Sequence, residues 1–219
     1  GKGYRPLGSL NTILYELING NGIVKQYNDY SSILEFESEY SNGKRNGKGK
    51  EFDNSGTLIF EGEYLNGKKH GKGKEYNCYG KLLFEGEYLY DFYLKGKYYI
   101  NEKLEFEGHF LYNKKWNGKG YDKNGNIIYE LINGNGNVRE FYGDGNLIFE
   151  GEYLNGKRNG KGIEYSEGKI EFEGEYLNGK RNGKGKKYKD GKLIFEGEYI
   201  NGKRKKLKKE SDEDSDSTL

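Results

Sequence analysis

An aromatic residue recurs along this chain at intervals of 20 to 24 residues, each time within the same short phrase, as in LIFEGEYINGKR at residues 193–204. A period of this length indicates one supersecondary unit repeated in tandem. Each unit is too small to bury its own apolar face, so neighbouring units must bury it for one another. The aromatic anchors are Tyr15, Phe36, Phe60, Phe84, Phe106, Tyr129, Phe149, Phe172 and Phe195.

The residues around each anchor predict a β-strand with two different faces. An aliphatic residue stands two positions before the anchor, whereas the residue directly before it is aliphatic in some copies and Glu in others. Side chains alternate between the two faces of a strand, so one set should be buried and the other exposed. At Phe60 we predict an inner set of Leu58, Phe60, Gly62 and Tyr64 and an outer set of Ile59, Glu61 and Glu63. The glycine leaves a hollow in which an aromatic ring from an adjacent strand can lie.

A tip and a second strand follow each anchor strand. The tip reads Asn-Gly-Lys-Arg-Asn-Gly at residues 155–160, and Asn-Gly favours the positive φ angles of a tight hairpin turn. The second strand ends on a further aromatic residue, such as Phe52 or Tyr76, before a glycine-containing link. Strict alternation puts Phe52 on the side of Lys48 and Lys50, whereas a β-bulge would turn it to the other side. One repeat is therefore a β-hairpin, and the facing of its closing aromatic stays open.

Composition agrees with a thin repeat array and restricts the function. Hydrophobic residues make up 32% and charged residues 33%, which is little for a globular core, whereas the 16% of aromatic residues can cover a thin sheet. The 36 glycines argue against helix. A net charge of +2 gives no general attraction to nucleic acid, and one Cys excludes a disulfide framework. With no signal peptide and no long apolar run, we expect a cytoplasmic protein.

Three copies depart from the repeat. The copies at Tyr15 and Tyr129 lack the Gly-Glu-Tyr part and have shortened tips, and we expect the sheet to bend or narrow there. The copy at Phe84 replaces its tip with residues 90–95 (YDFYLK). We divide the chain into an incomplete repeat at 1–14, about nine repeats at 15–202 and a disordered, basic-then-acidic tail at 203–219. The incomplete repeat suggests a fragment of a longer chain.

The repeated phrase resembles the MORN repeat, with a closing Lys-Glu-Tyr and a Gly-Lys-Leu link that are similar to the MORN-variant subclass. The resemblance is closest at residues 149–162 and extends over roughly residues 10 to 204. It implies an all-β, elongated and twisted antiparallel sheet of stacked hairpins, without catalysis or cofactor. It also implies a scaffold for protein partners that associates with anionic membranes. Two alternatives stay open: a regulatory segment of a larger enzyme, such as a lipid kinase or methyltransferase, and an antitoxin-like protein.

Two residue patterns could suggest chemistry, and the repeat argues against both. Glu61 and Glu63 could act as paired carboxylates, but the same pair recurs in most copies, so we predict structural ion pairs with Lys48, Lys50 or Lys72. His70, His109 and Cys78 lie far apart without the spacing of a metal site, and His70 should be a solvated turn residue. We therefore predict no catalytic, metal-binding or cofactor-binding residues.

The hairpin tips carry the strongest candidates for a binding surface. Two basic residues occur at each regular tip and should project from one margin of the sheet, where they could contact anionic lipid. The basic start of the tail would act with them. The predicted contacts are Lys44, Arg45, Lys68, Lys69, Lys157, Arg158, Lys180, Arg181, Lys203, Arg204, Lys205 and Lys206. The alternative without a binding function is a solvated margin that prevents aggregation.

The aromatic centre and the tail offer further hypotheses. Exposed aromatic residues can anchor interfaces, so a partner or self-association patch is predicted at Tyr90, Phe92, Tyr93, Tyr112 and Trp116, with local repacking as the alternative. The open edges of the sheet could also mediate self-association. In the tail, Ser211 resembles a site for an acidophilic kinase, and residues 217–219 (STL) resemble a C-terminal PDZ ligand.

Overall fold

The computed structural model describes residues 2–4, 13–28, 33–142 and 144–205. The described residues form strands joined by turns, which confirms the all-β prediction. The strands are β1 (Lys2–Tyr4), β2 (Ile13–Glu16), β3 (Gly22–Tyr27), β4 (Leu34–Ser41), β5 (Lys44–Phe52), β6 (Leu58–Leu65), β7 (Lys68–Tyr76), β8 (Leu82–Leu89), β9 (Phe92–Ile100), β10 (Lys103–Leu111), β11 (Lys114–Tyr121), β12 (Ile127–Leu131), β13 (Gly136–Phe141), β14 (Leu147–Leu154), β15 (Lys157–Ser166), β16 (Lys169–Leu177), β17 (Lys180–Lys189), β18 (Lys192–Ile200) and β19 (Lys203–Arg204).

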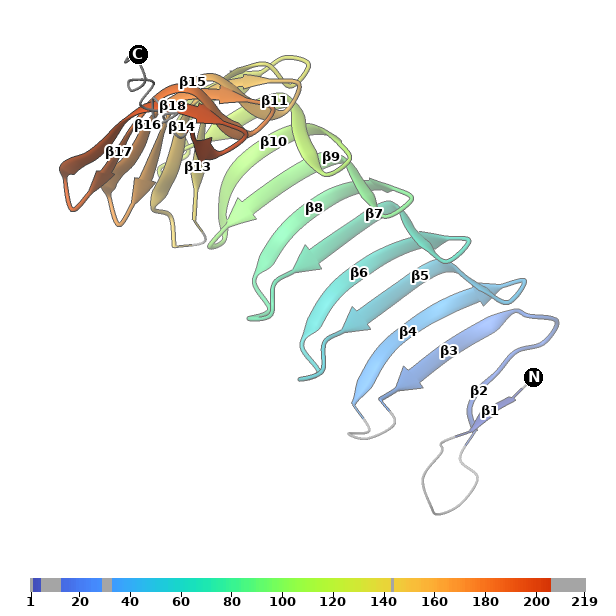
Figure 1. Ribbon diagram of the computed structural model, residues 1–219. Coiled ribbons are helices and arrows are strands. Elements are labelled where there is room, and N and C mark those ends of the chain that lie inside the picture. The colour runs from blue at the N-terminus through green and yellow to red at the C-terminus, as the bar shows by residue number, and fades with distance from the viewer. Residues whose placement is uncertain (1, 5–12, 29–32, 143, 206–219) are drawn as a thin grey trace, which may run out of the picture.

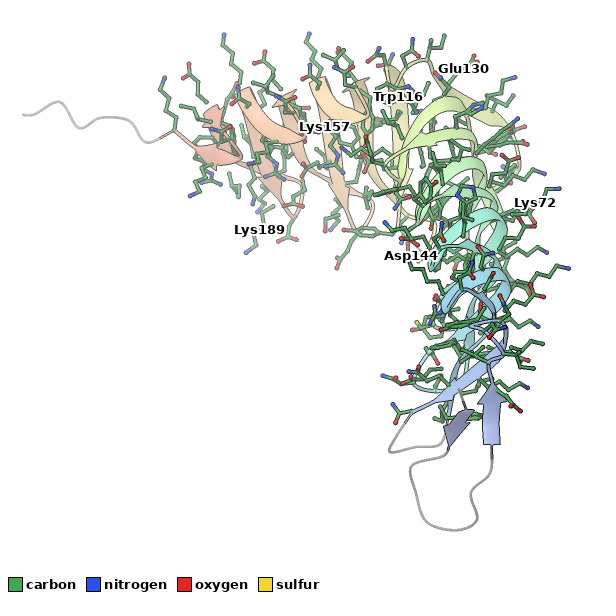
Figure 2. All side chains as sticks on the ribbon, turned by 90° about the vertical axis from the view of Figure 1, so that its right-hand side faces the viewer. Lys72, Trp116, Glu130, Asp144, Lys157 and Lys189 are labelled. Atoms are coloured by element: carbon green, nitrogen blue, oxygen red, sulfur yellow. The ribbon has the colours of Figure 1, made fainter. Side chains whose placement is uncertain are left out.

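Consecutive strands pair antiparallel along the chain, so the molecule is an elongated stack of hairpins (Figure 1). The stack is not one continuous sheet. Strands β3 to β12 form a ten-stranded sheet, β13 to β19 a seven-stranded sheet, and β1 and β2 a separate pair. Both breaks fall at the shortened copies, where the sheet was expected to bend or narrow. In Figure 2 the two large sheets form two arms that meet at a corner, where Glu130 lies on the outer side and Asp144 on the inner side.

One side of each sheet, the ring face, carries the aromatic core. Phe60, Phe84 and Phe106 have no exposed surface, and Tyr64 is 5% exposed. Phe60 meets Tyr64 of its own strand (centroids 5.5 Å apart) and Tyr88 of the next repeat (5.3 Å) edge-on, and Phe172 meets Tyr176 and Tyr199 in the same way. Burying a ring of this kind stabilises the fold by about 1.5–3 kcal/mol. The predicted inward positions of Phe60 and Tyr64 are confirmed.

The glycine of the anchor strand lies directly under the anchor ring. A Cβ atom at Gly62 would stand 2.7 Å from the ring of Phe60 and 2.7 Å from the Cα atom of Gly73, which is its cross-strand partner. Real Cβ atoms do not approach other atoms so closely, so both strands need glycine where the ring covers them. The hollow predicted between the inner rings is therefore present, but at Gly62 the ring of the same strand fills it instead of the predicted ring from an adjacent strand.

A β-bulge in each regular anchor strand overturns part of the predicted facing. Glu51 pairs with Phe60 and the next residue, Phe52, pairs with Leu58, so Ile59 is skipped. Residues directly opposite each other share a face. Leu58 therefore lies with Phe52, away from the core, and its predicted inward position is wrong. The position of Ile59 turns toward the core instead, as its counterparts Ile148 and Ile128 show by packing against the buried rings.

The other side of each sheet, the charged face, carries the closing aromatics. The hydroxyl of Tyr76 donates to a carboxylate oxygen of Glu61 at 2.9 Å, and Tyr165 donates to Glu150 at 2.6 Å. Alternation therefore holds over the last part of the second strand, from Gly73 to Tyr76. The bulge that the sequence raised for Phe52 lies in the first strand and changes the facing of Leu58 and Ile59.

Candidate functional site

A long groove runs over the charged face of the ten-stranded sheet. Its volume is about 940 Å³, and its walls extend from Ile23 on β3 to Gly108 on β10. The paired glycines of successive strands, such as Gly62 and Gly73, form its floor. Because the Cβ positions of these residues face the anchor ring on the other side of the sheet, the backbone lies bare between two rows of charged residues. The repeated glycines admit the anchor ring on the ring face, and the charged residues on either side of them form the walls of the groove on the charged face.

The first row alternates in sign from strand to strand without interruption. Each member lies directly opposite the next in the strand register, so the row crosses the whole sheet. Its members are Lys25, Glu37, Lys50, Glu61, Lys74, Glu85, Lys97, Glu107, Lys119 and Glu130. Lys50 and Glu61 form one of the predicted ion pairs, at 3.9 Å between Nζ and Oε2. Both groups are largely exposed, so a pair of this kind contributes only about 0–1 kcal/mol.

The carboxylates of the second row have a structural role; this row includes Glu39, Lys48, Glu63, Lys72, Glu87 and Lys95. The backbone N–H of Lys72 donates to Oε2 of Glu63 at 3.3 Å, directly after Gly71, which has a φ of 77°. The same bond joins Lys48 to Glu39 at 2.8 Å. The carboxylate satisfies a donor that the irregular strand leaves unpaired. Glu63 therefore binds backbone rather than the lysine side chains that the sequence predicted for it.

The first-row carboxylates are also engaged. Glu61 accepts a hydrogen bond from Tyr76, and Glu85 accepts one from Tyr99 at 2.6 Å. Desolvation, together with the bond to Glu61, raises the pKa of Tyr76 to about 12. Both glutamates of each pair thus have recurrent structural partners. Sequence reasoning missed the groove, because neither the bulge nor the cross-strand register can be seen in one repeat.

The two basic residues of each tip point in different directions. The first, such as Lys157, is exposed, whereas the second, Arg158, lies over the ring of Phe149 at 4.2 Å and binds Glu140 through Nε (2.9 Å) and Nη2 (2.8 Å). Arg45 covers Phe36 in the same way, Lys69 covers Phe60, and Arg181 covers Phe172. The expectation that both residues project from the margin is wrong, because the second one covers an otherwise open ring face.

The exposed tip lysines have aliphatic neighbours. Leu154 lies opposite Lys157, Leu177 opposite Lys180, and Ile200 opposite Lys203. These aliphatic side chains are about half exposed, at 49%, 50% and 51%. Lys44 and Lys68 occupy the same place at the tips of the first sheet and are also exposed; Lys68 lies opposite Leu65, whereas Lys44 lies opposite Ser41. The tip margin therefore presents aliphatic and basic side chains side by side.

The segment assigned to the tail begins as part of the last hairpin. Lys203 and Arg204 form β19, and Arg204 lies over Phe195 at 4.3 Å, as the second basic residue of a tip does elsewhere. Lys205 is exposed, and its ammonium group pairs with Glu198. Lys206, Ser211 and residues 217–219 lie outside the described residues.

The predicted aromatic patch divides into two groups. Tyr90, Phe92 and Tyr112 are 46%, 42% and 70% exposed at two adjacent tips, where Phe92 meets Tyr112 edge-on at 5.5 Å. Tyr93 instead stacks on Phe84 at 3.9 Å and belongs to the core. The half-buried Trp116 lies at the corner (Figure 2), and its carbonyl accepts the N–H of Gly134 at 2.7 Å. The exposed Leu89, Leu94 and Leu111, which the sequence did not single out, complete the patch.

The remaining candidates do not come together. His70 is half-buried and packs on Tyr90 at 5.0 Å, so its predicted solvated position is wrong, whereas His109 and Cys78 are exposed elsewhere. In the part of the chain that the structure covers, no three His, Cys, Asp or Glu residues are placed to hold a metal ion. The same part contains no helix that could cross a bilayer.

Comparison with known families agrees with this geometry. A family model for the MORN repeat matches residues 36–58, 60–77, 149–169 and 172–192. No curated protein sequence matches the chain significantly. All four matches begin at or next to a buried anchor ring and end near the closing aromatic or the link that follows it. The regular phrase, the stacked hairpins and the matched stretches together identify the chain as a tandem MORN-repeat protein.

Proposed function

We propose that this chain is a non-enzymatic scaffold whose charged-face groove holds an extended segment of a protein partner. The observation that carries the proposal is the continuous groove over β3 to β10, with its bare glycine floor and alternating rows. The carboxylates beside it already bind backbone or tyrosine groups, so they do not form a reactive pair. The family is typically non-catalytic, which supports the same conclusion.

The spacing of the groove indicates what kind of partner fits. Because Lys and Glu alternate from strand to strand, the charge pattern repeats every two strands, which is about 9.4–9.8 Å along the groove. Three residues of an extended chain span about 9.3–9.9 Å. A partner segment in the polyproline II conformation has three residues per turn, so like charges at every third residue would lie on one side and keep in register with the lysine-bearing and glutamate-bearing strands. Two turns of α-helix span about 10.8 Å and would drift out of register.

Two peptides of identical composition test this proposal. In one, Glu and Lys each recur every third residue; in the other, the same residues are grouped in blocks. We expect the periodic peptide to bind more tightly in calorimetry and the double variant Lys72→Glu/Lys95→Glu to lose that preference. The control Lys169→Glu/Lys189→Glu carries the same charge change at exposed positions outside the groove. Equal binding of both peptides would refute the proposed mode.

Anionic membrane association is a second candidate, favoured by the pairing of exposed aliphatic and basic residues at the tips. A lysine near an anionic surface contributes about 1 kcal/mol, and the adjacent aliphatic side chain could enter the interfacial region. The exposed Tyr90, Phe92 and Tyr112 lie among the same tips. The regulatory-segment and antitoxin-like alternatives stay hypotheses that no feature of this structure favours.

Vesicle flotation tests the second candidate. The variant Lys44→Glu/Lys68→Glu/Lys157→Glu/Lys180→Glu should lose binding to phosphatidylserine vesicles at low salt, because only exposed lysines are reversed. Four exposed lysines away from the tips, Lys81, Lys123, Lys169 and Lys189, give a control with the same net charge. If both variants bind alike, net charge alone explains the result and the tip margin is not the site.

A further inference from the structure

The corner between the two large sheets contains a cavity that the regular repeats do not build. The ten-stranded sheet ends at β12 and the seven-stranded sheet begins at β13. Between these two strands of the short hairpin there is a single β-bridge, which pairs Ile132 with Asn135. A cavity of about 340 Å³ opens beside the links of the neighbouring hairpins. Asn146 and Gly145 line it, next to Asp144 on the inner side of the corner in Figure 2.

The walls of the cavity are largely apolar. The bulge places the aliphatic residue two positions before each anchor on the charged face together with the closing aromatic, as Leu147 with Phe141. In the regular repeats the next hairpin continues the sheet beyond such a pair. At the corner the sheet stops, so these side chains remain around an open space. The apolar wall residues are Ile100, Leu104, Tyr121, Ile128, Phe141 and Leu147.

The charged groups around the cavity leave a positive excess. Lys103, Lys123 and Arg139 line it together with two carboxylates. The carboxylate of Asp122 accepts the N–H groups of Asn124 and Asn126, and that of Glu105 accepts the hydroxyl of Tyr129. Arg139 pairs with Glu150 at 3.3 Å. Among the described residues, Lys103 and Lys123 have no ion pair, so their ammonium groups are free to bind an anion.

We propose that this corner cavity binds a small amphiphilic carboxylate, with its hydrocarbon chain against the apolar walls and its carboxylate at Lys103 and Lys123. The volume lies at the lower end of the range for small-molecule sites, which limits the ligand to one short chain. The apolar walls remove hydrocarbon surface from water. A carboxylate forms charge-assisted bonds with ammonium groups. This site is separate from the tip margin and does not depend on the groove partner.

Displacement of a fluorescent probe from the full chain tests the proposal. The probe is anilinonaphthalene sulfonate, which combines apolar rings with an anionic group. We expect saturable binding at one site and displacement by decanoate. Decanol should displace the probe less well because it lacks the charge, and decylamine should not compete because it carries the opposite charge. Binding that does not saturate, or equal competition by decylamine, would overturn the proposal.

Two variants locate the site. Lys103→Glu/Lys123→Glu should weaken decanoate about tenfold while leaving decanol unchanged, because it removes only the anion contacts. Lys169→Glu/Lys189→Glu, at exposed positions of the second sheet, is the matched control and should bind like the parent chain. Leu147→Trp should fill the cavity and abolish binding of both compounds, with folding checked by circular dichroism. A control variant as impaired as Lys103→Glu/Lys123→Glu would place the ligand elsewhere.

Discussion

The regular hairpin β6–β7 and the short hairpin β12–β13 begin alike and end differently. In the regular hairpin, Phe60 is enclosed by two tyrosines and covered by Lys69, whose ammonium lies 4.1 Å from the ring centre. In the short hairpin, Tyr129 is followed by Leu131, and Val138 fills the opposite strand, both almost fully buried. The strands of the short hairpin still bury apolar side chains, but they are too short to continue the hydrogen-bond ladder of the sheet. Sheet continuity therefore depends on the Gly-Glu-Tyr extension rather than on the anchor.

The two short copies support this interpretation because they break the array in the same way. Each closes with one isolated bridge, Ile18 with Asn21 and Ile132 with Asn135. Each stands between two separate sheets. The same local sequence thus gives the same interruption in two different surroundings.

Converting the short hairpin into a regular one should have the largest effect on the molecule. Replacing residues 129–138 (YELINGNGNV) by YEGEYLNGKRNGKG supplies the missing strand lengths and the bulge glycine. We expect the two large sheets to merge and the corner cavity to close. Small-angle scattering should show a changed maximum dimension, and the fluorescent probe should no longer bind. An unchanged scattering profile would mean that the corner has another cause.

Removal of an interior anchor ring should cost the most stability among point changes. Phe60→Ala deletes a fully buried ring that contacts two repeats, and we expect a loss of about 3–5 kcal/mol. Phe195→Ala, at the half-buried anchor of the last hairpin, should cost clearly less. Urea unfolding measures both. If the two losses were equal, burial between neighbouring repeats would not be what stabilises the array.

The two basic residues of a tip should differ in the same assay. Arg158→Ala removes the cover of Phe149 and leaves Glu140, whose side chain is 23% exposed, without its bidentate partner, so we expect a loss of about 1–3 kcal/mol. Lys157→Ala should change stability by less than about 0.5 kcal/mol, because its side chain is exposed. A large effect at Lys157 would contradict the inward and outward assignment of the pair.

The smallest effect concerns pH. Burial opposes ionisation of Glu164, but its bonds with Arg181 and Tyr176 and the charge of Arg158 lower its pKa below 4.5 in the folded chain. A carboxylate whose pKa is lower in the folded chain than in the unfolded chain stabilises the fold at pH values above its unfolded pKa. This stabilisation is lost as the pH falls through the folded pKa. Stability should therefore fall below about pH 4.5, and Glu164→Gln should be less stable at pH 7 with a shallower acid response. Urea titrations at several pH values test this slope.

Local sequence was sufficient to predict the hairpin array and its aromatic core. The period is written in the order of residues, the Asn-Gly tips favour positive φ on their own, and the alternation at Phe60 and Tyr64 follows from strand geometry. These features need no knowledge of the neighbouring repeat. A bend or narrowing of the sheet at the short copies was also foreseeable, because a missing segment cannot pair.

Only the tertiary structure decided which way the ambiguous side chains turn and where the open spaces lie. The bulge at Ile59 depends on the register with β5, and it turns Leu58 away from the core. Arg158 turns inward because Glu140 from the preceding hairpin and Glu164 from its own strand bind it over the ring of Phe149. The groove and the corner cavity arise from how strands pair and where pairing stops. These are relations between repeats, and a single repeat does not contain them.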